Sequence, residues 1–221
     1  MEYGFQTIDK INDLIKSGVD KISVILRHSA RNYDHKRPHM EAFMGLTEDG
    51  KKFAKDYAGR LNFDGSVSFF SSMICRCVET SFMMEKGISG CRINSNRLEE
   101  CLFPFYVKNP KKVYEVVVNH GEDQFFRMWF KDELSEKVIS NSKESALKIF
   151  RFMRNNLTSN KINFMVSHDW NLYIVQEYFL KLSYNDVNRV EFLDGFILYE
   201  ADGKLFIMNK KGFVRALNET A

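Results

Sequence analysis

The sequence predicts an α/β fold in which helices cover a mainly parallel sheet. Short apolar runs alternate along the chain with longer segments of helical periodicity. These runs are mostly apolar, which is typical of strands buried on both faces in parallel sheets. In the last part of the sequence, two alternating runs flank Asp202-Gly203, a dipeptide typical of hairpin turns. Together the three observations indicate a layered α/β protein with a C-terminal β-hairpin.

The first half of the chain alternates helical and strand patterns. Helices are expected within residues 7–18, 46–61 and 75–88, and strands at residues 21–27 and 66–72. Thr7 is a candidate N-cap of the first helix and Gly18 its stop signal, while Thr47 is a candidate N-cap of the second helix. This alternation is what the connection of parallel strands requires.

The second half begins with a helix-rich aromatic stretch whose boundaries are poorly marked. The expected elements are this stretch at 109–134, a helix at 142–157, a strand at 163–169, a helix from Trp170 and the hairpin at 195–209. Asn141 or Ser142 can cap the helix at 142–157. No repeat or Pro/Gly-rich linker divides the chain, so one domain over residues 1–221 is expected.

Composition excludes several classes of protein. The 32 Lys and Arg nearly balance the 29 Asp and Glu, which argues against a nucleic-acid partner. No apolar run reaches the roughly 18 residues of a membrane span, and residues 1–20 lack the layout of a signal peptide. The expectation is a cytoplasmic protein without a membrane partner. The four cysteines form no CxxC pair, which favours reduced thiols over a zinc site.

Polar and charged residues follow three of the predicted strands. They are Arg27, His28 and Arg31 after the first, Ser71, Ser72 and Arg76 after the second, and His168 and Asp169 after the third. In open α/β sheets, ligands bind beyond the carboxyl ends of the strands, where helix N-termini add partial positive charge. If the strands are neighbours, three arginines and two histidines meet in one pocket. Guanidinium groups bind phosphoryl oxygens in a planar, charge-assisted way, so this pocket predicts a phosphoryl ligand.

These residues belong to three ordered motifs. The motifs are RHSAR at 27–31, SSMICRCVET at 71–80 and VSHDWN at 166–171. Together they resemble the histidine phosphatase superfamily, also called phosphoglycerate mutase-like, in which an Arg-His-Gly motif follows the first strand. A Ser-x-x-x-Arg-x-x-x-Thr motif, met here by Ser72, Arg76 and Thr80, opens a later helix, and a Ser/Gly-His motif follows a later strand. The resemblance covers residues 21–182 and implies a three-layer α/β/α sandwich.

The resemblance implies a phosphatase that acts on a small phosphorylated substrate in two steps, without a metal or other cofactor. His28 would attack the phosphorus and form a phosphohistidine, which water would then hydrolyse. Arg27, Arg31, Arg76 and His168 would hold the equatorial oxygens. The alternatives are a mutase-like phosphotransferase and a non-catalytic module that binds phosphorylated ligands.

The general acid has two candidates. Arg31 and the His-Asp-x-Asn pattern that starts at His168 resemble the acid phosphatase and phytase branch, in which the aspartate, here Asp169, donates the proton. In the mutase-like branch the donor is a glutamate shortly after Arg-Leu, and NRLEE at 96–100 offers Glu100, or else Glu99. We prefer Asp169. The alternatives without a catalytic role are that Asp169 only caps the following helix and that Glu99 and Glu100 are surface carboxylates.

Three further features leave alternatives open. Ser29 stands where the family has glycine, so the turn after the nucleophile carries a side chain whose hydroxyl can donate to phosphate. The segment DHKRPH at 34–39 either meets a second anionic group of the substrate or is a solvated loop. The aromatic clusters at 103–106 and 125–130 either line the leaving-group side of the site or pack in the core, and packing is expected.

Overall fold

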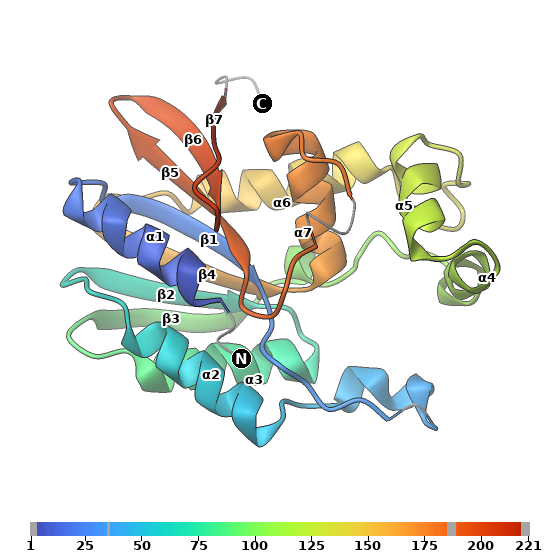
Figure 1. Ribbon diagram of the computed structural model, residues 1–221, viewed down its shortest axis with the longest axis horizontal. Coiled ribbons are helices and arrows are strands. Elements are labelled where there is room, and N and C mark those ends of the chain that lie inside the picture. Colours follow the sequence, from blue (N-terminus) through green and yellow to red (C-terminus); the bar gives the residue numbers. More distant parts are fainter. Residues whose placement is uncertain (1–3, 35, 185–188, 218–221) are drawn as a thin grey trace.

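A seven-stranded sheet runs through the computed structural model, which describes residues 4–34, 36–184 and 189–217 (Figure 1). Within these residues the strand order is β3-β2-β4-β1-β5-β6-β7. The strands are β1 (Lys21–Arg27), β2 (Ser66–Ser71), β3 (Arg92–Leu98), β4 (Lys161–Ser167), β5 (Gly195–Ala201), β6 (Lys204–Asn209) and β7 (Val214–Leu217).

Seven α-helices and three short helical segments are found in the described residues. The α-helices are α1 (Phe5–Lys16), α2 (Glu48–Gly59), α3 (Cys75–Gly87), α4 (Pro110–His120), α5 (Glu122–Phe130), α6 (Ser142–Asn155) and α7 (Asp169–Val175). The short segments are the 3-10 helices η1 (Pro38–Phe43) and η2 (Glu100–Leu102) and the π-helical turn η3 (Gln176–Leu180). None of the helices in this part of the chain combines the length and the apolar character needed to cross a bilayer.

The sheet confirms the predicted α/β class but is parallel only in its first half. β3, β2, β4 and β1 are parallel neighbours, whereas β5, β6 and β7 continue from β1 in antiparallel pairs. The predicted C-terminal hairpin is formed by β5 and β6; β5 pairs with the central strand β1, and β6 pairs with the edge strand β7. The predicted turn is present, with Asp202 at φ 51° and Gly203 at φ 69°, as a primed hairpin turn requires.

Two strands had no clear sequence signal. β3 reads RINSNRL, and its side chains are exposed except for the half-buried Ser95, so the sequence has neither an apolar run nor an alternating pattern. β7 has only four residues, VRAL, of which none is fully buried. Both strands lie at edges of the sheet, where one neighbour supplies the hydrogen bonds and little apolar surface is covered.

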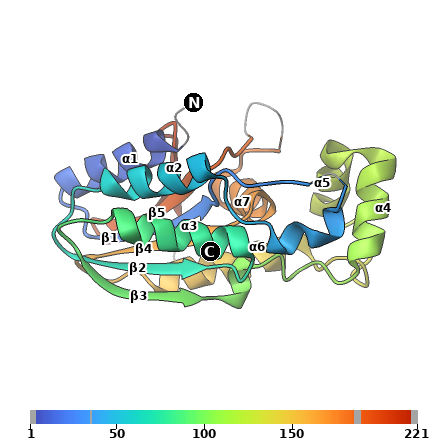
Figure 2. The same cartoon turned by 90° about the horizontal axis from the view of Figure 1, so that it is seen from below.

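Helices cover both faces of the sheet, as the three-layer prediction requires (Figures 1 and 2). Ile22, Val24 and Leu26 of β1 belong to a buried cluster with residues of α1, α2 and α3. Ile25 points to the other face and belongs to a second cluster with residues of α4 to α7. The alternation follows from the two-residue period of a strand, and it explains why both faces of β1 are mostly apolar.

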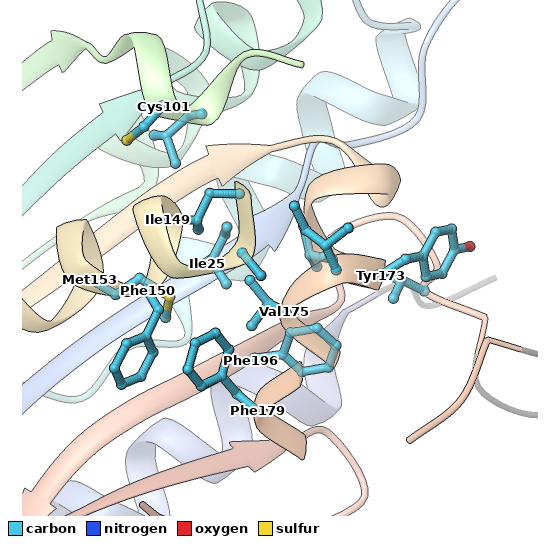
Figure 3. Close-up of a cluster of buried hydrophobic side chains, with 14 of the residues drawn as sticks. Ile25, Cys101, Ile149, Phe150, Met153, Tyr173, Val175, Phe179 and Phe196 are labelled. Atoms are coloured by element: carbon cyan, nitrogen blue, oxygen red, sulfur yellow. The ribbon is translucent and has the colours of Figure 1, made fainter. Parts of the chain in front are cut away.

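The second cluster contains the aromatic stretches whose role the sequence left open. Phe125, Phe126, Trp129 and Tyr106 are all buried in it, so these side chains are core. Figure 3 shows another part of the same cluster, in which Phe150 of α6 lies beside Phe179, with ring centroids 4.1 Å apart. The expectation of core packing is confirmed for these residues.

Most predicted helix starts are confirmed, with one correction. Thr47 Oγ1 accepts a hydrogen bond from Gly50 N at 2.9 Å, and Asn141 Oδ1 accepts one from Glu144 N at 2.9 Å. Thr7 is not the N-cap of α1, because Gly4 holds that position and Thr7 is buried in the first turn. α1 therefore begins at Phe5, before the predicted start at Thr7. Gly4 can hold the N-cap position with a left-handed φ of 75° because glycine tolerates this conformation without strain.

Candidate active site

The ends of three adjacent strands bring the predicted site residues together. Arg27 of β1 is level with Ser167 of β4, and Ser71 of β2 is level with Val166 of the same strand. His28 N donates to the Ser167 carbonyl at 3.0 Å, and Ser72 N donates to the Val166 carbonyl at 3.0 Å. The three chain segments that leave the sheet here therefore start side by side, at the carboxyl edge of the parallel strands.

His28 is buried, and its hydrogen bonds identify its tautomer. Its Nδ1 lies 2.8 Å from the Ser29 carbonyl, which can only accept, so Nδ1 carries the proton. Its Nε2 lies 3.1 Å from Arg76 Nε, which can only donate, so Nε2 holds a lone pair. Burial is the main reason that the pKa of His28 lies well below the ordinary 6.5, and His168 and Arg76 lower this pKa further. The imidazole is thus neutral, and the Nε2 lone pair accepts from Arg76, so Nε2 can act as a nucleophile once Arg76 releases it.

His168 has the opposite tautomer. Arg76 Nη2 donates to its Nδ1 at 3.3 Å, so the proton is on Nε2, which lies 2.9 Å from Ser72 Oγ. The ring is buried beside that of His28, with centroids 5.7 Å apart. Burial, followed by the charge of Arg76, holds the pKa of His168 well below its usual range. Its Nε2–H is a donor that can serve an anion in the same pocket.

Arg31 and Arg76 converge on one carboxylate, that of Glu41. Its Oε1 lies 3.0 Å from Arg31 Nη2 and 3.4 Å from Arg76 Nη2. The Glu41 carbonyl also accepts a hydrogen bond from Arg76 Nη1 at 3.2 Å. Arg31 Nη1 is buried and has no hydrogen-bond partner. Two of the three arginines predicted to bind phosphate are therefore directed at the same negatively charged group.

Arg27 has a different set of partners. Its Nη2 forms an ion pair with Asp169 Oδ2 at 2.7 Å, and its Nη1 donates to the Val190 carbonyl at 2.9 Å. The guanidinium lies over the ring of Phe192, 4.6 Å from its centroid, and this ring is also 5.6 Å from that of His28. Arg27 Nε is buried without a partner. The Arg27 side chain is held firmly and keeps one buried donor for a ligand.

The two candidate acids differ in their surroundings. Asp169 is the first residue of α7, where it accepts from Trp170 N at 3.0 Å and pairs with Arg27. His168 holds the N-cap position, so Asp169 is not the cap of this helix and belongs to the arginine cluster. Glu100 is exposed at the start of η2. Among the described residues, no hydrogen bond or ion pair joins Glu100 to the arginines and histidines of the site. Asn171 is buried and bonds to Leu102 O, Ser167 Oγ and Tyr106 Oη, so it braces the start of α7.

Ser29 faces α2 instead of the pocket. Its hydroxyl donates to the Gly50 carbonyl at 2.7 Å, and its N–H donates to Thr80 Oγ1 at 3.0 Å. Its φ is not among the positive values found in the described chain, so the position does not require glycine. The hydroxyl therefore connects β1 to α2 and is not directed at an anion.

The basic segment at 34–39 is only partly described. His35 and the side chain of His39 lie outside the described part of the chain. Arg37 Nε pairs with Asp34 Oδ2 at 2.7 Å, and its side chain is mostly exposed. In the parts of the chain that the structure describes, no group of three or more His, Cys, Asp or Glu could hold a metal ion. The four cysteines are free.

Two residues beside the site were not found from the sequence. Glu41 had a weak signal, since it is an isolated acid directly after a basic segment. Phe192 had none, because it lies in an irregular segment more than 160 positions after Arg27 and reaches the site only through the fold. The geometry as a whole suits a tetrahedral anion beside a neutral imidazole, with arginine N–H groups on several sides.

Similar proteins were found only by comparison of structures. No protein-family model matches the sequence, and no curated protein matches it. The protein YhfR of Bacillus stearothermophilus is 15% identical with a TM-score of 0.55, over 90% of this chain and 96% of that one. A phosphoserine phosphatase from Entamoeba histolytica, solved in complex with phosphoserine, is 12% identical with a TM-score of 0.52, over 84% and 94%.

A phytase from Hafnia alvei, solved with tartrate, extends the comparison. It is 9% identical with a TM-score of 0.55, over 90% of each chain. At such identities the likeness concerns the fold, and the aligned lengths include nearly all of it. The chain thus shares its overall fold with these solved structures.

Proposed function

We propose that this protein is a phosphomonoester hydrolase that forms a phosphohistidine on His28. One observation carries the proposal. The buried His28 imidazole is neutral, with its proton on Nδ1 and its Nε2 lone pair held by Arg76. A histidine nucleophile needs a neutral ring with a lone pair on one nitrogen. Nε2 has this lone pair, and it would become free when Arg76 turns from His28 to the phosphoryl group of a substrate.

The proposed reaction has two displacements. Nε2 of His28 attacks the phosphorus, the bond to the leaving oxygen breaks, and that oxygen takes a proton from the general acid. Water then attacks the phosphohistidine and the P–N bond breaks. The general acid, which became a carboxylate in the first step, accepts a proton from this water. The products are an alcohol and inorganic phosphate, and the acid ends in its initial protonated state.

The pocket supplies the charge that this reaction requires. Arg27, Arg31, Arg76 and His168 would bind the phosphoryl oxygens as charge accumulates on them. The buried, unpartnered donors Arg27 Nε and Arg31 Nη1 support this assignment, since a buried donor without an acceptor costs about 1–3 kcal/mol. Because three guanidinium groups provide this stabilisation, we propose a reaction that needs no metal ion.

Asp169 is the preferred general acid, and Glu100 remains the alternative. Asp169 pairs with Arg27 inside the arginine cluster, so it lies beside the pocket. To act as the acid it must take up a proton as Arg27 turns to the phosphoryl group. The names of two fold neighbours, a phosphoserine phosphatase and a phytase, support hydrolysis of a phosphomonoester. A small phosphorylated molecule is accordingly the proposed substrate.

Trapping the intermediate tests the proposal. Brief mixing with radiolabelled p-nitrophenyl phosphate in the presence of EDTA should leave acid-labile phosphate on the protein. His28→Gln should abolish the label and lower turnover at least about 10³-fold, as expected for loss of a nucleophile. His120→Gln, which changes an exposed histidine at the end of α4, is the matched control and should label normally.

Three outcomes would contradict the proposed function. Normal turnover by His28→Gln would exclude the phosphohistidine, and loss of labelling in EDTA would exclude the metal-free reaction. Transfer of the label to an acceptor alcohol, without release of phosphate, would indicate a phosphotransferase.

A further inference from the structure

Glu41 occupies the anion pocket from within the chain. One of its carboxylate oxygens contacts both Arg31 and Arg76, at 3.0 and 3.4 Å, and its main-chain carbonyl accepts from Arg76 as well. These guanidinium groups are the ones assigned above to the phosphoryl oxygens. A bound phosphoryl group and the Glu41 side chain therefore compete for the same N–H donors.

Charge balance indicates that the two anions exclude each other. Asp169 offsets Arg27, both histidines are neutral, and the single carboxylate of Glu41 faces the two cations Arg31 and Arg76. A phosphoryl dianion alone would neutralise these two cations. With Glu41 still in place, its carboxylate would lie next to the phosphoryl oxygens on the same two arginines, and like charges this close repel each other.

The carboxylate satisfies the pocket only in part. Arg31 Nη1 stays buried without an acceptor although Nη2 of the same guanidinium is paired. A tetrahedral phosphoryl group has three equatorial oxygens and can accept from several guanidinium N–H groups at once. Exchange of Glu41 for a phosphoryl group thus gains hydrogen bonds that Glu41 does not make.

Displacement of η1 exposes little apolar surface. Met40, Ala42 and Phe43 of η1 are already exposed, and the Glu41 side chain is itself 39% exposed. Figure 1 shows this short helix, in blue on the connection from β1 to α2, standing away from the sheet. The Glu41 contacts with Arg31 and Arg76 are thus polar contacts that a ligand can replace.

We infer that Glu41 is an affinity-setting and specificity-determining residue of the phosphate pocket. Its carboxylate competes with the phosphoryl group, so a bare anion such as inorganic phosphate binds weakly. A phosphorylated substrate binds more tightly because its leaving group adds contacts, and product phosphate is expelled when Glu41 returns to the arginines. The inference rests on the anion pocket of the proposed function and does not depend on the hydrolytic steps.

Binding of inorganic phosphate tests the inference without any turnover. Titration calorimetry at low ionic strength is done on the wild type, Glu41→Gln and Glu48→Gln. Glu48 lies in the first turn of α2, where its mostly exposed carboxylate pairs with Lys51, so its substitution changes the net charge equally and controls for long-range attraction. We expect Glu41→Gln to bind phosphate about tenfold more tightly, with Glu48→Gln within about twofold of the wild type. Glu41→Ala is a second variant, which should show the same gain if the glutamine disturbs η1.

The outcomes separate this inference from the proposed function. Phosphate affinity that is unchanged or weaker in both Glu41 variants, relative to Glu48→Gln, overturns the inference. So does a failure of all the proteins to bind phosphate. Tighter binding by the Glu41 variants supports the inference even if no phosphomonoester is hydrolysed, in which case the proposed function alone fails.

Discussion

Arg76 determines the chemical difference between the two histidines. Its Nε donates to His28 Nε2 and its Nη2 donates to His168 Nδ1, from one rigid, planar fork. Each imidazole must then carry its proton on the opposite nitrogen. His28 is left with an acceptor at Nε2, as a nucleophile requires, and His168 with a donor at Nε2, as a ligand of an anion requires.

The identity of the acid can be tested with leaving groups of different basicity. Asp169→Asn should slow hydrolysis of an alkyl phosphate such as glycerol phosphate by about 10²–10⁴-fold, because an alkoxide needs protonation as it leaves. The same variant should slow p-nitrophenyl phosphate much less, since nitrophenolate leaves without a proton. Glu100→Gln is the comparison and should affect both substrates by less than about twofold if Asp169 is the acid. If Glu100→Gln instead slows the alkyl phosphate strongly and Asp169→Asn does not, Glu100 is the general acid.

At the scale of elements, the start of α2 is joined closely to the loop that follows β1. Thr47 N donates to the Ala30 carbonyl at 3.1 Å, and the Ser29 hydroxyl donates to the Gly50 carbonyl at 2.7 Å. A Cβ at Gly50 would lie only 2.0 Å from the Ala30 carbonyl oxygen, so only glycine allows this approach. α2 thereby supports the loop between His28 and Arg31.

Gly50→Ala should destabilise the protein, against the usual effect of this change in a helix. Alanine normally stabilises a helix interior by about 0.5–1 kcal/mol relative to glycine. Here the clash with main chain should reverse the sign and cost about 1–3 kcal/mol or more. Urea denaturation measures the difference.

Gly59→Ala, near the other end of α2, is the matched control. Its Cβ would lie 3.4 Å from the nearest atom, the Gly87 carbonyl oxygen, so this variant should be neutral or slightly stabilised. Equal free energies of unfolding for the two variants would show that the main chain at Ala30 moves away from the new Cβ with little loss of stability.

At the scale of the whole molecule, folding buries two histidines between the sheet and its helices. Both are neutral in the folded protein, because burial and the arginines lower the pKa of each well below 6.5. In the unfolded chain each returns to its ordinary pKa. Below pH 6.5 the unfolded state therefore binds more protons than the folded state, and the free energy of unfolding falls as the pH falls.

The expected pH dependence is steep and depends on these two residues. Each histidine contributes a slope approaching about 1.4 kcal/mol per pH unit below its unfolded pKa. Urea denaturation between pH 7.5 and 5 should show the decline, and His28→Gln/His168→Gln should flatten it. A double variant that keeps the wild-type slope would show that other groups cause the acid sensitivity.

Much of the fold followed from the sequence, because β1, β2 and β4 are buried on both faces and hence mostly apolar between their ends. The caps Thr47 and Asn141 were likewise found, since capping is a local interaction between neighbouring residues. β3 and β7 were missed because edge strands are held by main-chain hydrogen bonds, which leave no mark on side-chain type. The antiparallel pairing of β5 with β1 was missed because strand direction depends on the path of the chain.

The sequence by itself determined the apolar strands, the order of the three motifs and the residue types available at the strand ends. These properties are local, since each depends on a few consecutive side chains. Tertiary structure alone decided which nitrogen of each histidine carries the proton, that Glu41 meets Arg31 and Arg76, and that Ser29 faces α2. These depend on contacts between residues far apart in the chain, whose distances are set only when the helices pack on the sheet.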